Sequence, residues 1–187
     1  NVFARYAQVS SFTREQLLLA ERALLREMNY ALIRPTAFSF AEAYVESVLR
    51  STNRLRRFPD RIDFCGSGFA DYGDMPTCFK ETTYYLVELS AYGHEGLKFA
   101  PSLLAAAAVA SSLSYLKITW DEVPILEEVV GYTSDELKEP IDFLRRVARD
   151  AQMIEEWGEG LMVNEKYEGC SNFVFSEINS EGDPTRR

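Results

Sequence analysis

Apolar residues recur at three- and four-residue spacing through most of this chain, which is the period of an α-helix with one buried face. The first stripe contains Leu17, Leu18, Leu24, Leu25 and Met28. Thr13, with Gln16 three positions later, has the pattern of a capping box at the start of this helix. We expect the helix to end before Pro35, because the residue preceding a proline avoids helical backbone angles. We expect Leu17, Leu24 and Met28 to lie in a core.

A second helix is expected to start between Thr36 and Ser39, and its apolar face is Phe40, Tyr44, Val48 and Leu49. Residues 52–76 then lose periodicity and contain several glycines and prolines, which is typical of a loop. A loop of this length is unusual inside a compact domain and indicates an insertion.

The middle of the chain predicts a central helix. A helix over residues 77–92 ends at Gly93, and the next begins at Pro101, which suits the first helical turn. It continues through Leu103, Leu104 and the alanine run 105–108. Because this helix is apolar on all sides, it must be surrounded by other elements.

Two more capping boxes follow, Thr119 with Glu122 and Thr133 with Glu136, with Gly131 as the stop between them. The last long helix has an apolar stripe at helical spacing. Its members are Leu137, Ile141, Leu144, Val147, Ala148 and Ala151. Pro140 lies inside this helix and is expected to kink it near its start.

These patterns predict an all-α chain with about five helices after Thr36, packed around the central apolar helix. We divide it into a leading helix with its linker (residues 1–34), a helical domain (35–155, with a loop insertion at about 52–76) and a C-terminal tail (156–187). Within the tail, some order is expected near residues 173–175.

Composition narrows the classes of function. Hydrophobic residues make up 47% of the 187 positions, which is enough for a packed core, so disorder is not the default. A net charge of -9 opposes a nucleic-acid-binding surface. The longest apolar run, residues 99–115, is interrupted by Pro101 and by serines and is too short to span a membrane. Three widely spaced cysteines indicate neither a disulfide framework nor a metal site, and a reducing compartment is expected.

Catalytic constellations are weak. A cysteine–histidine nucleophile pair would need His94, the one histidine, which has glycines at 93 and 96. The segment Gly66-Ser67-Gly68 neither follows a strand nor opens a helix, so a phosphate-binding loop is not supported. We therefore expect no enzyme activity, no metal, no cofactor and no small-molecule substrate.

Three segments, in this order, resemble the A/B-type (mitotic) cyclins. They are FTREQLLLAERALLREMNYALIRPT (12–36), LVELSAYGHEGLKFAPSLLAAAAV (86–109) and WDEVPILEEVVGYTSDELKEPIDFL (120–144). The first resembles the fifth helix of the first cyclin box and its linker. The other two resemble the C-terminal cyclin fold, whose helices surround a central apolar helix.

The resemblance implies a non-catalytic regulatory subunit that binds and activates a cyclin-dependent serine/threonine kinase in the nucleus and cytoplasm. It matches Glu21 to the central acidic residue of the kinase-facing helix. Leu25, Tyr30 and Leu32 match apolar contacts on the same edge. The lysine that partners the acidic residue in the family, and the substrate-docking patch, have no counterpart in this chain.

Two questions stay open at this point. A cyclin-fold adaptor that binds transcription or scaffold proteins, without activating a kinase, is the alternative function. Arginines also gather at the start of the expected loop, at positions 50, 54, 56, 57 and 61. They could bind phosphate, guide a substrate or act as a nuclear-localisation patch, although a solvated loop is the simpler interpretation.

Overall fold

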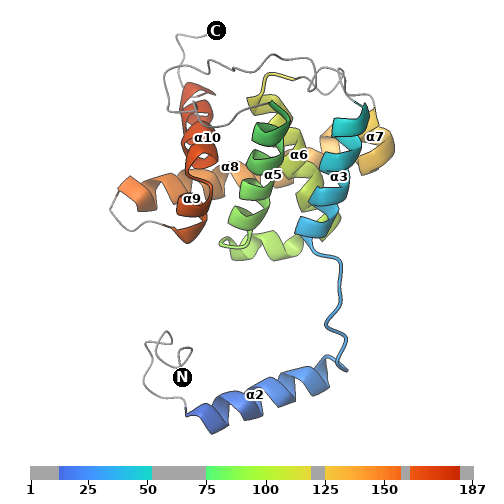
Figure 1. The fold of residues 1–187 in the computed structure, drawn as a ribbon, viewed down its shortest axis with the longest axis vertical. Coiled ribbons are helices and arrows are strands. Elements are labelled where there is room, and N and C mark those ends of the chain that lie inside the picture. The colour runs from blue at the N-terminus through green and yellow to red at the C-terminus, as the bar shows by residue number, and fades with distance from the viewer. Residues whose placement is uncertain (1–12, 52–74, 119–124, 157–160, 182–187) are drawn as a thin grey trace. The chain divides into compact units, whose positions relative to one another are not determined.

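The computed structural model describes residues 13–51, 75–118, 125–156 and 161–181, and every regular element in these ranges is a helix (Figure 1). The all-α prediction is thereby confirmed for the described part of the chain. The chain divides into two units, Asn1–Pro35 and Thr36–Arg187.

The first unit contains helix α2, Arg14–Glu27. Its predicted capping box is present: the Gln16 amide donates to Thr13 Oγ1 (3.3 Å), and the Thr13 amide donates to Gln16 Oε1 (2.8 Å). The helix ends before Pro35, as predicted, and Asn29 explains where. Asn29 has a φ of 49°, the left-handed conformation that asparagine tolerates and that commonly ends a helix.

The second unit is a bundle around one central helix (Figure 1). Its elements are α3 (Ala37–Ser51), α5 (Met75–Ser90), the 3-10 turn η2 (His94–Lys98), α6 (Pro101–Tyr115), α7 (Ile125–Val130), α8 (Ser134–Glu156), α9 (Met162–Lys166) and α10 (Glu168–Glu181). Helix α6 packs against α3, α5 and α8. Helix α7 packs on α3, and α10 on α5 and α8.

Helix α6 can be central because its side chains are small. The alanines at 105–108 are all fully buried. Alanine is the best helix former, and it loses no side-chain entropy on burial. The small side chains also allow neighbouring helices to approach closely. Pro101 stands at its start, as predicted, and Lys117, with a φ of 57°, follows its end.

Short polar motifs set the helix starts of the second unit. The Thr36 amide donates to Ser39 Oγ (2.9 Å) and the Ser39 amide to Thr36 Oγ1 (3.2 Å), which caps α3. The predicted box at Thr133 is present, with Glu136 accepting the Thr133 amide at 2.8 Å. The box predicted at Thr119 with Glu122 lies outside the described residues, as do positions 52–74 of the expected loop.

The segment predicted as a tail contains two helices that belong to the core. Its buried side chains include Tyr167, Cys170, Phe173, Val174 and Ile178. The Phe173 ring meets the Tyr115 ring edge-on, with centroids 6.4 Å apart. The buried Tyr85 hydroxyl also donates to Asn164 Oδ1 (3.0 Å), which ties α9 to α5. Residues 161–181 therefore complete the bundle instead of trailing from it.

The buried thiol of Cys78 is expected to make the fold less stable at alkaline pH. Burial raises its pKa from 9.0 to about 11; a Thr82 hydrogen bond opposes the shift and the Glu81 charge adds to it. Above pH 9 the unfolded chain loses this proton while the folded chain keeps it, so the free energy of unfolding falls. A difference of two pKa units lowers the free energy of unfolding by roughly 2–3 kcal/mol, and the full loss is reached above pH 11.

Urea unfolding at pH 8, 9, 10 and 10.5 checks this prediction in the wild type and in Cys78→Ala. We expect the stability advantage of the wild type over the variant to shrink as the pH rises. A pH-independent difference between the two proteins would contradict the assignment to Cys78. The pKa values of Tyr44, Tyr84 and Tyr167 are also raised, but both proteins contain these tyrosines. Their contribution to the pH dependence therefore cancels in the difference between wild type and variant.

Candidate functional site

Two of the four residues expected to bind a partner lie on one face of α2. Glu21 and Leu25 are four positions apart, and residues at this spacing are neighbours on a helix surface. The Glu21 side chain is exposed, and Leu25 is half-buried. The carboxylate is thus available to an external donor, with apolar surface beside it.

The other two residues follow the end of the helix. Tyr30 is 65% exposed and Leu32 is 60% exposed. The Tyr30 amide donates to the Leu25 carbonyl (2.9 Å), which fixes the turn after α2. Tyr30 has a φ of 56°, a conformation in which a non-glycine residue is uncommon. The structure therefore places Tyr30 next to the half-buried Leu25, while Leu32 lies further along the chain.

The rest of the α2 stripe corrects a prediction. Leu17, Leu24 and Met28, expected in a core, are 41%, 61% and 42% exposed, and no residue of α2 is buried. The periodic pattern identified an apolar face correctly, but periodicity does not say what covers it. In the described part of the first unit α2 is the one helix, so none of the residues described there forms a second helix that could cover its stripe.

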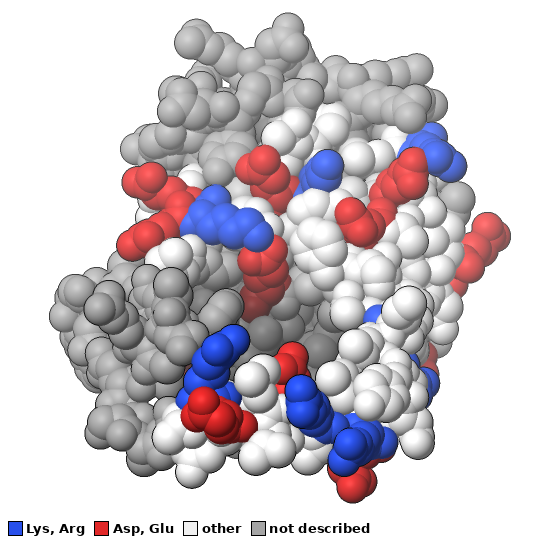
Figure 2. All heavy atoms as spheres, turned by 60° about the horizontal axis from the view of Figure 1, so that its bottom comes forward, with Lys and Arg blue, Asp and Glu red and all other residues white. Residues whose placement is uncertain are grey.

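Charge on the surface is mixed. Blue and red side chains are interspersed on the face shown in Figure 2. Helix α2 itself carries both signs, at Arg14, Glu15, Glu21, Arg22, Arg26 and Glu27. The surface of α2, with exposed leucines between charges of both signs, suits contact with another protein better than contact with a polyanion.

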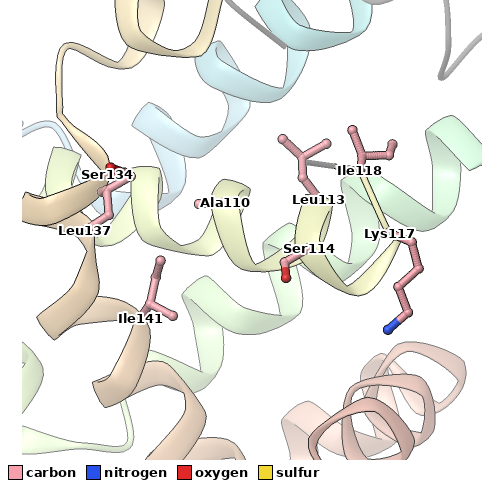
Figure 3. Close-up of a pocket in the computed structure, with 8 residues that line it drawn as sticks. All are labelled: Ala110, Leu113, Ser114, Lys117, Ile118, Ser134, Leu137 and Ile141. Atoms are coloured by element: carbon pink, nitrogen blue, oxygen red, sulfur yellow. The ribbon is translucent and has the colours of Figure 1, made fainter. Parts of the chain in front are cut away.

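A groove that sequence reasoning missed lies between α6 and α8 (Figure 3). Its volume is about 550 Å³, and it is lined by Ala110, Leu113, Ser114, Lys117, Ile118, Ser134, Leu137 and Ile141. Leu137 and Ile141 both belong to the predicted apolar stripe of the last long helix, but Leu137 is buried whereas Ile141 is only half-buried. The available signal was the polar Ser114 near the end of α6 and the charged Lys117 just after that helix.

No group of three or more histidine, cysteine, aspartate or glutamate side chains is placed to hold a metal ion in the described ranges. None of the helices described combines the length and the hydropathy needed to cross a membrane.

Comparisons with known proteins point to one family. The family model described as cyclin, C-terminal domain, matches residues 35–168. "Putative cyclin-B3-1" of Arabidopsis thaliana is 25% identical over 142 residues, covering 76% of this chain and 30% of the relative. Mouse "Cyclin-J-like protein" is 27% identical over 139 residues (74% and 34%), and Drosophila melanogaster "G2/mitotic-specific cyclin-A" is 30% identical over 130 residues (68% and 21%).

These matches cover only about a third or less of each relative's length. No solved structure matches the chain significantly. The family model nevertheless covers the bundle from the linker before α3 to the first residue of α10, and the helical fold agrees with it. The chain belongs to the cyclin family.

Proposed function

We propose that this cyclin is a regulatory subunit that binds and activates a cyclin-dependent serine/threonine kinase in cell-cycle control, in the nucleus and the cytoplasm. The observation that carries the proposal is the exposed face of α2, where Glu21 stands beside Leu25. These residues stand where the cyclin pattern has its kinase-facing acidic and apolar positions. The Drosophila match, named a G2/mitotic-specific cyclin, supports the assignment to cell division.

The catalytic chemistry in this proposal belongs to the kinase. Phosphoryl transfer needs a lysine–glutamate ion pair and a metal site to be assembled around ATP. A cyclin that binds the assembled state more tightly than the open state shifts the population toward it. Glu21 contributes by accepting a hydrogen bond from the kinase, and Leu25, Tyr30 and Leu32 contribute apolar contact area.

The test is recovery of kinase activity with the full-length protein from its own cell extract. We expect wild type to bring down histone-kinase activity, and Glu21→Ala to reduce it at least about tenfold, since a hydrogen bond to a charged group contributes about 1.5–3 kcal/mol. Glu27→Ala, which removes a carboxylate from a different face of α2, is the matched control and should retain most of the activity.

Two results would count against the proposal. Equal losses of kinase activity in Glu21→Ala and Glu27→Ala would show that the overall charge of α2, and not the face with Glu21, determines kinase recovery. Absence of kinase activity with wild type, despite recovery of other proteins, would favour the cyclin-fold adaptor instead. Circular dichroism of each variant shows whether the helices are intact, so a folding defect is not mistaken for lost binding.

A further inference from the structure

A polar hollow opens on the second unit where the turn after α5 meets α8. Its volume is about 430 Å³. One wall is the chain from Tyr92 to Glu95, and the other is the outer face of α8. The α8 residues that line it are Phe143, Arg146, Val147, Arg149 and Asp150. No residue of α2, and no residue that lines the groove between α6 and α8, is among these lining residues, so the hollow does not depend on the kinase proposal.

The floor of the hollow is apolar and tightly built. A Cβ on Gly93 would lie 2.9 Å from the Phe143 ring and 3.0 Å from Val147, so only glycine fits there without movement. Phe143 is buried, and its ring also meets Phe99 with centroids 5.6 Å apart. The Tyr92 ring, in contrast, is 56% exposed at the edge of the hollow. An entering group therefore meets the exposed side chain of Tyr92, above a floor of tightly packed, buried side chains.

Charged groups of both signs surround this floor. Arg146 Nη2 lies 3.2 Å from Glu95 Oε2 across the hollow. Arg149, three positions along the same helix, makes no hydrogen bond or ion pair with any residue the structure describes. His94 adds an imidazole and Asp150 a second carboxylate. Two guanidinium groups thus line one hollow, and one of them is engaged by an internal carboxylate.

We propose that this hollow binds an aryl phosphomonoester, the phosphotyrosine side chain of a partner peptide. Paired arginines are the usual receptors for phosphoryl groups, because the planar guanidinium matches two phosphate oxygens. The volume exceeds what a phosphate alone needs, and the exposed side chain of Tyr92 at the edge of the hollow suits an aromatic ring. In the free protein Glu95 forms an ion pair with Arg146. The phosphate must displace this carboxylate, so Glu95 competes with the ligand for Arg146.

This competition yields a sharp expectation for variants. Arg149→Ala should weaken binding at least tenfold, because it removes a phosphate ligand. Glu95→Gln should strengthen binding severalfold, because it removes the anion that competes for Arg146. Lys138→Ala, an exposed cation on α8 that does not line the hollow, is the matched control and should bind like wild type.

The experiment is a titration of the full chain with phenyl phosphate, followed by NMR shifts of residues 92–95 and 143–150, with inorganic phosphate and AMP in parallel. We expect saturable shifts confined to these residues, with phenyl phosphate binding at least tenfold more tightly than inorganic phosphate. Shifts that do not saturate, equal affinity for inorganic phosphate, a preference for AMP, or a Glu95→Gln variant that binds more weakly would each overturn the proposal. The spectrum of each variant without ligand reports whether it is folded.

Discussion

Replacing Phe143 with alanine is expected to remove about 3–5 kcal/mol from the free energy of unfolding. The ring is 2% exposed, and it supports two parts of the bundle at once. A Cβ on Gly93 would lie 2.9 Å from the ring and one on Gly96 3.0 Å from it, so the turn η2 packs directly on the ring. Phe99, the residue that follows η2, contacts the same ring. The truncation therefore leaves a cavity that a backbone held by these contacts cannot fill.

Leu97→Ala is the control for this measurement. Leu97 lies in the same turn and is 89% exposed, so its loss should change stability by less than about 0.5 kcal/mol. Urea denaturation with an unchanged m-value would assign the difference to the native state. If Phe143→Ala cost no more than Leu97→Ala, the packing of η2 on α8 described above would be incorrect.

Phe173→Ala is expected to have a comparable effect, about 3–5 kcal/mol, although residue 173 lies in the segment predicted as a tail. Its side chain is 1% exposed and packs against Tyr115 at the end of the central helix. Asn172→Ala, an exposed neighbour on α10, should be within about 0.5 kcal/mol of wild type.

The comparison of these two variants asks whether α10 unfolds with the rest of the bundle. We expect a single transition in both, monitored by fluorescence and by circular dichroism, with the midpoint of Phe173→Ala shifted to lower urea. A first transition that removes only α10, leaving the remaining helices folded, would contradict its assignment to the core.

The local signals in the sequence located helix starts well. Thr13 and Thr133 cap the helices that their motifs predicted, because a capping box depends only on residues three positions apart. The end of α10 and its burial were harder to predict, since Gly169, Ser171, Asn172 and Ser176 are poor helix formers. The stripe of Cys170, Phe173, Val174 and Ile178 was present at helical spacing, and tertiary packing outweighed the weak propensity.

The candidate sites could be predicted only in part from sequence patterns. The family resemblance selected Glu21, and the structure places its side chain at the surface, but neither observation identifies what it contacts. The hollow at Arg149 was invisible in the sequence. It depends on Tyr92 and α8 lying together, although they are some 50 residues apart in sequence. It also depends on the glycine at 93, which the sequence pattern predicts only as the end of a helix.

The pairing of α10 and α9 with α5 also has a consequence for biosynthesis. Tyr85 and Asn164 are 79 positions apart, so a ribosome that has just released Tyr85 must add these 79 residues before the two side chains can pair. At roughly 5–20 residues per second this takes several seconds or more. During that interval the surface of α5 that packs against α9 and α10 has no partner. Any need of this cyclin for chaperones is therefore expected to fall between the synthesis of α5 and that of α10.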